Sequence, residues 1–378
     1  MPDSPCRLGR RPLLRAAAAS VASLGIARTS MGAQMAEGAQ RLEQVASFTE
    51  PRQVTGVAVA PNGRVFVNFP RWEEDVAISV AEVGPGGALT PYPDARWNAY
   101  RDAKPADPGR SFVCVQSVTM DPVGNLWVVD AAAPNLAFEV PGGPKLVRID
   151  LGSNQVSQVY PFDTRIAPQG TYLNDVRFTP DGQRAVITNS GQPGSLIVLD
   201  VGSGQARRVL DDHPSTQFQP DFPVVVDGQQ LRRPDGQPPQ FSADGIAVDP
   251  RGDYAYWQAT SGNTMYRIPV RALFDTGLDP ARLGGMVEVF TQTFLADGYW
   301  AARNGALYVT SCGDNSVKRL LPDRNFAIEV QDQRLLWPDS MAEGADGLIY
   351  VTASHIPRMK AWQGPGVTQT GLFRFRPA

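Results

Sequence analysis

One pattern of apolar and polar positions recurs six times along the chain. Each copy opens on a polar residue, continues as a run of alternating apolar residues, turns at a glycine and ends in a second apolar run. Alternation with a period of two predicts β-strands, and the glycine predicts the tight turn of a hairpin. We therefore expect six β-hairpins: TGVAVAPNGRVFVNF (55–69), QSVTMDPVGNLWVVD (116–130), NDVRFTPDGQRAVIT (174–188), DGIAVDPRGDYAYWQ (244–258), DGYWAARNGALYVTS (297–311) and DSMAEGADGLIYVTA (339–353).

The spacing of these hairpins predicts the fold class. Successive turn glycines are 61, 58, 70, 53 and 42 residues apart: Gly63, Gly124, Gly182, Gly252, Gly305 and Gly347. One four-stranded propeller blade takes about 40–50 residues, so each interval holds one blade and a variable insertion. The sequence thus predicts an all-β fold, a six-bladed β-propeller. An open solenoid would not need such insertions, and a sandwich would not repeat six times.

Four segments outside the repeats complete the expected architecture. A strand near 371–377 is expected to pair with one around 44–49 and close the ring. Residues 211–241 contain apolar runs on either side of Asp227-Gly228, which predicts an extra β-arm between the third and fourth blades. Together with a second insertion at 76–112, this arm could cap one face and convert the channel into a pocket.

Residues 1–38 are predicted to be an export signal. A basic start with Arg10-Arg11 precedes a weakly hydrophobic Leu/Ala stretch and then small residues, the layout of a bacterial export signal. The arginine pair resembles a twin-arginine signal; a disordered basic tail is the alternative. No later segment reaches the ~18 apolar residues of a membrane helix. We expect the propeller (39–378) to be exported, periplasmic or extracellular, without a membrane span.

Composition excludes several other functions. A net charge of −3 argues against a nucleic-acid partner, which normally requires a basic face. With only His213 and His355 in the chain, a metal site built on several histidines is excluded. The three cysteines form no C-x-x-C pair, which excludes zinc ribbons and thioredoxin-like motifs. We expect Cys114 and Cys312 to be buried free thiols.

The residues that open the repeats are the main candidates for chemistry. The first strand of each blade lines a propeller's channel, so these side chains should form one ring: Thr55, Gln116, Asn174, Asp244, Asp297 and Asp339. Three aspartates this close would resist ionising together, because like charges raise one another's pKa. Ca²⁺, a Lys or Arg from a loop, or a cationic ligand would neutralise them. Alternatively, the aspartates only hydrogen-bond the backbone of the neighbouring blade.

Four further residues have two interpretations each. His355, just after the sixth repeat, is either a ligand contact or general base at the channel mouth, or a structural residue. Trp72, Tyr92 and Trp97 either form an apolar wall over one end of the channel or pack the outer face of the first blade.

The chain resembles the yellow/major royal jelly protein family. Its segments NFPRWEEDVAISVAEVG and LTPYPDARWN, within 68–98, carry the PRW and PYP…WN elements of that family, and the similarity extends over nearly all of 45–376. Relatives of the family include the calcium-dependent gluconolactonase/senescence-marker propellers, in which a Glu, two Asn and an Asp hold the metal. By repeat position the resemblance implies Thr55, Asn174, Asp244 and Asp297 here, with Asn174, Asp244 and Asp297 able to hold Ca²⁺. Thr55 lacks the carboxylate, and Asp339 could compensate.

Three functions follow as hypotheses. The first is a small-molecule-binding protein of the yellow/royal jelly type, with a ligand in the channel for which a cation is one candidate. The second is a Ca²⁺-dependent hydrolase of lactones or esters, in which the metal polarises the carbonyl and Asp297 activates water as the catalytic residue. The third is a scaffold for an unidentified protein partner, for which the sequence carries no signature.

Overall fold

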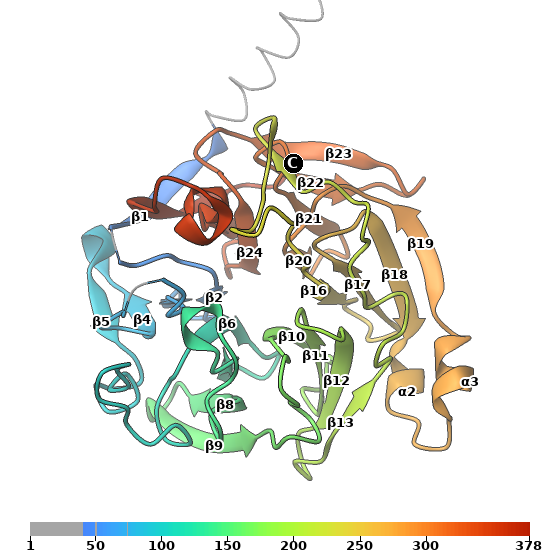
Figure 1. Cartoon of the computed structure of the whole chain (residues 1–378), viewed down its shortest axis with the longest axis horizontal. Helices are drawn as coiled ribbons and strands as arrows, with labels where there is room; N and C mark the ends of the chain where they lie inside the picture. Colours follow the sequence, from blue (N-terminus) through green and yellow to red (C-terminus); the bar gives the residue numbers. More distant parts are fainter. Residues whose placement is uncertain (1–40, 50, 74) are drawn as a thin grey trace, which may run out of the picture.

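Six four-stranded antiparallel sheets surround a common centre in the computed structural model (Figure 1). The structure describes residues 41–49, 51–73 and 75–378. The predicted all-β six-bladed propeller is therefore confirmed. The predicted export signal (1–38) lies outside the described residues. No helix in these ranges is long and apolar enough to cross a membrane.

Five of the sheets are built from four consecutive strands, with the first strand of each innermost (Figure 1). In chain order they are β2 (Val57–Val59), β3 (Val65–Asn68), β4 (Val80–Val83) and β5 (Leu89–Pro91); β6 (Val115–Met120), β7 (Leu126–Asp130), β8 (Lys145–Asp150) and β9 (Gln155–Pro161); β10 (Leu173–Phe178), β11 (Arg184–Asn189), β12 (Ser195–Asp200) and β13 (Ala206–Val209); β16 (Ala243–Val248), β17 (Tyr254–Ala259), β18 (Thr264–Pro269) and β19 (Glu288–Gln292); β20 (Tyr299–Ala301), β21 (Leu307–Ser311), β22 (Ser316–Leu320) and β23 (Phe326–Gln331).

The sixth sheet closes the ring with strands from both ends of the described chain. It contains β24 (Pro338–Glu343), β25 (Ile349–Ala353), β26 (Gln369–Phe375) and β1 (Glu43–Thr49), and β1 pairs antiparallel with β26. The predicted closing pair is confirmed. Such closure ties the first and last blades together and leaves only short edges open to pairing.

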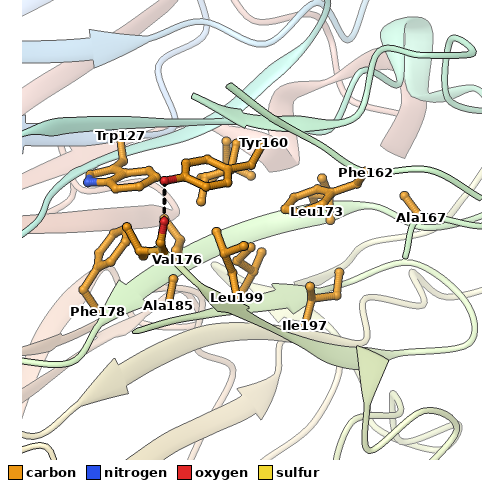
Figure 2. Close-up of a cluster of buried hydrophobic side chains, with 14 of the residues drawn as sticks. Trp127, Tyr160, Phe162, Ala167, Leu173, Val176, Phe178, Ala185, Ile197 and Leu199 are labelled. Carbon is orange, nitrogen blue, oxygen red and sulfur yellow. Dashed lines mark hydrogen bonds between the residues drawn. The ribbon is translucent and has the colours of Figure 1, made fainter. Parts of the chain in front are cut away.

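Neighbouring blades pack face to face through apolar side chains. Figure 2 shows one such cluster, in which Trp127 and Tyr160 of the second sheet lie against side chains of the third. The Trp127 and Phe178 rings are 4.7 Å apart between centroids. The Tyr160 hydroxyl donates a hydrogen bond to the Val201 carbonyl at 2.9 Å. The core is thus divided among the interfaces between blades, and each blade needs both neighbours.

The predicted β-arm between the third and fourth blades is confirmed. It consists of β14 (Val225–Val226) and β15 (Gln229–Gln230), joined at Asp227 and Gly228 with φ of 49° and 77°. Positive φ at both central residues is typical of a type I′ hairpin turn. Asn315 of the fifth blade donates a hydrogen bond to Asp227 Oδ1 at 2.8 Å. The arm therefore reaches the fifth blade, beyond the third and fourth blades that it connects.

The structure shows the predicted insertion at 76–112 in part. Residues 80–91 supply β4 and β5, the outer strands of the first blade, because β3 pairs with β4 and β4 with β5. Residues 92–112 form a strand-free connection from β5 toward β6. The remaining helical elements are short: α2 (Val270–Leu273), α3 (Pro280–Gly284), and the 3₁₀ segments η1 (Pro85–Gly87), η2 (Pro134–Leu136), η3 (Ile356–Arg358) and η4 (Lys360–Trp362).

Candidate functional site

Four inner strands carry a β-bulge at the polar residue that opens the repeat. In β6, β10, β16 and β24 the pairing register slips by one residue at Gln116, Asn174, Asp244 and Asp339. A bulge re-aims the side chain at its extra residue. The local structure therefore frees these four polar side chains from the regular alternation of the strand.

Threonine hydroxyls in the second strands of two blades accept hydrogen bonds from the backbone where the inner strands begin. The Thr310 hydroxyl accepts hydrogen bonds from the N–H groups of Asp297 and Gly298 at 3.2 and 2.8 Å. Thr352 accepts one from Ser340 at 3.0 Å. A Cβ added at Gly298 would lie 2.0 Å from the carbonyl oxygen of Asp339, so only glycine allows the two strands to approach.

Five of the six predicted ring residues line one pocket of about 200 Å³ at this end of the channel: Gln116, Asn174, Asp244, Asp297 and Asp339. Ser190 and Thr260 add two hydroxyls to its wall, and Asn174 donates a hydrogen bond to Ser190 Oγ at 3.0 Å. The pocket therefore collects polar groups from the second to the sixth blade.

Thr55 and His355 lie outside this wall. The Thr55 hydroxyl donates to the Gln116 carbonyl at 2.7 Å and accepts from Asn68 at 2.8 Å, which joins the first two blades. His355 precedes η3 in a left-handed conformation with φ of 55°. Burial and the neighbouring Arg358 lower the pKa of His355 to about 4, so it is neutral at physiological pH.

The three aspartates are buried and hold their protons tightly. Burial raises the pKa of Asp244 and of Asp339 well above the usual range, and repulsion from Asp297 raises both further. Burial raises the pKa of Asp297 to about 7, although the hydrogen bond from the Trp337 indole opposes the shift. Asp339 Oδ2 has no hydrogen-bond partner among the described residues. No lining residue of this pocket in the described chain is cationic.

An ion pair that the sequence reasoning missed lies one step deeper in the channel. Arg177 Nη2 is 3.3 Å from Asp175 Oδ2, and it also donates to the Tyr299 carbonyl at 3.0 Å. The signal was the spacing in N-D-V-R, because residues two apart on a strand share a face. Within the described chain, Arg177 compensates Asp175 and leaves Asp244, Asp297 and Asp339 without a counter-ion, which agrees with their raised pKa values.

Aromatic rings form the outer wall of the pocket. The Trp72 indole donates to the Tyr172 hydroxyl at 2.6 Å, and Tyr172 donates to Gln116 Oε1 at 2.9 Å. Phe241 follows the β-arm and lies edge-on to Trp362 at 5.2 Å between centroids. The wall comprises Trp72, Tyr172, Phe241, Trp337 and Trp362.

Of the two interpretations of Trp72, Tyr92 and Trp97, the structure supports the pocket wall for Trp72 and packing within the blades for the other two. Trp72 belongs to the pocket wall, whereas Tyr92 and Trp97 pack between the first and second blades, against Phe66 and Phe112. Among the described residues the pocket receives no side chain from 76–112. Its cover instead includes Trp362 and Met359 from the segment between β25 and β26, which the sequence analysis did not identify.

The PRW and WN elements are anchors for loops. Arg71 is fully buried, with Nε 2.6 Å from Asp75 and Nη2 donating to the Val76 carbonyl at 2.8 Å. Asn98 Oδ1 accepts from the N–H groups of Ser79 and Val80 at 2.8 and 3.0 Å. Trp72 thus follows directly after a buried, hydrogen-bonded residue, Arg71.

The residues as arranged do not fit a calcium centre. Within the described ranges, no group of three or more His, Cys, Asp or Glu side chains could hold a metal ion. One oxygen of Asp297 is taken by the Trp337 N–H, and the Thr55 hydroxyl is taken by backbone and Asn68. Ca²⁺ requires six to eight oxygen ligands. Cys114 and Cys312 are both buried and free, as predicted.

Comparisons with known proteins agree with this fold. A family model described as "Major royal jelly protein" matches residues 113–363. A gluconolactonase from Xanthomonas campestris superposes with a TM-score of 0.54 at 13% identity, covering 89% of this chain and 90% of that one. A luciferin-regenerating enzyme gives a TM-score of 0.54 at 11% identity, covering 89% and 94%. A search of curated proteins finds no match.

Proposed function

The chain belongs to the major royal jelly protein family, and from this premise we propose that it is an exported propeller that binds a small organic cation in the pocket at one end of its channel. One observation carries the proposal: three buried aspartates form the floor of a pocket whose outer wall is aromatic and, within the described chain, offers no cation.

Both parts of the pocket favour a cationic ligand. Buried carboxylates without partners are costly, and a bound cation removes that cost. Aromatic faces attract a cation through the ring quadrupole, most strongly when water is excluded. A volume of about 200 Å³ restricts the ligand to a small molecule. In a primary amine attached to an apolar group, the ammonium would contact the aspartates of the floor and the apolar group would contact the aromatic wall.

Benzylamine is expected to bind the wild type, and Asp297→Asn is expected to weaken this binding about tenfold to a hundredfold. The substitution keeps the volume of the side chain but removes the charge, and a hydrogen bond to a charged group is worth about 1.5–3 kcal/mol. Titration calorimetry measures both affinities. Asp253→Asn is the matched control, because Asp253 is exposed and pairs with Arg251 on the surface. Equal affinity in all three proteins would refute the proposal.

A calcium-dependent lactone or ester hydrolase is the second candidate, and it requires the pocket side chains to rearrange around the metal. The buried and unpartnered Oδ2 of Asp339 favours it, and the likeness in fold to a gluconolactonase is compatible with it. A ligand that binds only the native state raises the melting temperature by mass action. A melting temperature that rises with calcium in the wild type, and not in Asp339→Asn, would favour the hydrolase over the amine-binding protein.

A further inference from the structure

The opposite end of the channel contains a second cavity, of about 370 Å³. The inner strands run in the same direction around the ring, so their first residues face the pocket described above and their last residues face this cavity. Its wall is formed by the ends of the six inner strands β2, β6, β10, β16, β20 and β24 and by the turns that follow them. It shares no lining residue with the aspartate pocket and lies outside the proposed function.

Two hydrogen-bond donors of this cavity's wall have no acceptor. Arg177 Nε and Trp300 Nε1 are buried and lack a partner among the described residues. The Arg177 guanidinium lies 5.6 Å from the centroid of the Trp300 ring, so the two donors belong to one cluster. A buried donor without an acceptor costs about 1–3 kcal/mol, which an incoming acceptor would recover. The site therefore favours a ligand whose acceptor oxygens approach closely enough to reach these buried N–H groups.

Acceptors line the same cavity from three different blades. They are Asp121, Asp249 and Glu343. Asp121 and Asp249 are held by N–H groups of their own turns, and Glu343 by Arg303. A carboxylate accepts about four hydrogen bonds. Among the described residues, Asp121 already accepts four and Asp249 three, whereas Glu343 accepts from Arg303 alone, so Asp249 and Glu343 retain acceptor capacity. Arg177 is already paired with Asp175, so a ligand of this cavity must donate hydrogen bonds as well as accept them.

We infer that this second cavity binds a neutral polyhydroxylated ligand, a mono- or disaccharide. A hydroxyl group both donates and accepts, and it can therefore satisfy the free N–H groups of Arg177 and Trp300 and the spare acceptors of the carboxylates. The apolar remainder of the wall, which includes Phe178 and four turn prolines, matches the C–H face of a sugar ring. The chain would then carry two binding sites at opposite ends of one channel.

The indole N–H groups of two tryptophans report the two sites separately. Trp300 Nε1 lies at the second cavity, and Trp337 Nε1 donates to Asp297 in the first pocket. In ¹H–¹⁵N spectra of the whole protein, D-glucose and maltose are expected to shift the Trp300 indole resonance in a saturable way and to leave Trp337 unchanged. Benzylamine is expected to do the reverse. The Trp300 resonance is assigned by its loss in Trp300→Phe.

The same two positions supply matched variants. Trp300→Phe is expected to weaken sugar binding about tenfold, the cost of one hydrogen bond, and to leave benzylamine binding intact. Trp337→Phe is expected to leave sugar binding intact. If both sugars fail to move the wild-type Trp300 resonance, or bind Trp300→Phe equally well, the inference is refuted. Because benzylamine is read at Trp337, that failure is distinct from a failure of the proposed function.

Discussion

Lys145→Met is expected to lower the free energy of unfolding by about 3–5 kcal/mol, the usual cost of breaking a buried ion pair on one side. Lys145 and Asp130 are both fully buried, with 2.6 Å between Nζ and Oδ2. Lys145 also donates to the carbonyl oxygens of Pro108 and Gly143 at 2.8 and 3.0 Å. Methionine fills the space but leaves the Asp130 charge and both carbonyls without their donor. Chemical denaturation measures the loss.

An exposed ion pair provides the control for this prediction. Arg165 and Asp163 are also 2.6 Å apart, but their side chains are 88% and 51% exposed. Arg165→Met is expected to change the stability by less than about 1 kcal/mol, because water screens the pair. Similar small losses in the two variants would show that burial of the Lys145 pair does not contribute as described.

The stability of the wild type relative to Asp297→Asn is expected to fall as the pH rises from about 4 to about 7, by on the order of 4 kcal/mol. Burial raises the pKa of Asp297 from 3.8 to about 7. Between these values the native state keeps a proton that the unfolded chain releases, so raising the pH favours unfolding. Above pH 7 both states are ionised, and the difference becomes constant.

Comparison of the wild type with Asp297→Asn separates the effect of Asp297 on the pH dependence of stability from the effect of His355. The pKa of His355 is lowered from 6.5 to about 4, and a buried neutral histidine makes stability rise with pH in the same range. Both proteins retain His355, so its contribution cancels in the difference. Urea denaturation of both proteins at several pH values between about 4 and 8 measures the difference in their free energies of unfolding. A difference that is independent of pH, or that grows with pH, would contradict the buried, protonated Asp297.

The repeat made the architecture predictable, whereas covering loops made parts of the site unpredictable. Each turn glycine marks one inner hairpin, and Asp227-Gly228 marks the arm, because these signals are local. Trp362 reaches the pocket from a loop with no strand pattern. The sequence analysis counted β4 and β5 within the insertion at 76–112 because these strands are short and carry weak alternation.

The ring positions were predictable because they recur, but the orientation of each side chain was not. Repeat position alone placed Thr55 with the aspartates, yet its hydroxyl is taken by the neighbouring blade. Asp175 follows Asn174 in a bulge, and the bulge is what brings two successive residues toward the channel. Bulges depend on pairing between strands, which the sequence of a single strand does not determine.

Proton release on ligand binding tests the central claim most directly. If benzylamine binds beside the buried aspartates, its ammonium group must displace the proton that Asp297 holds below a pKa of about 7. Calorimetry near pH 6, in two buffers of different ionisation enthalpy, is expected to show release of about one proton per benzylamine bound. It is expected to show none for benzyl alcohol, which has the same shape without the charge. Binding of benzylamine without proton release, or equal binding of the alcohol, would contradict a cation site at the aspartate floor.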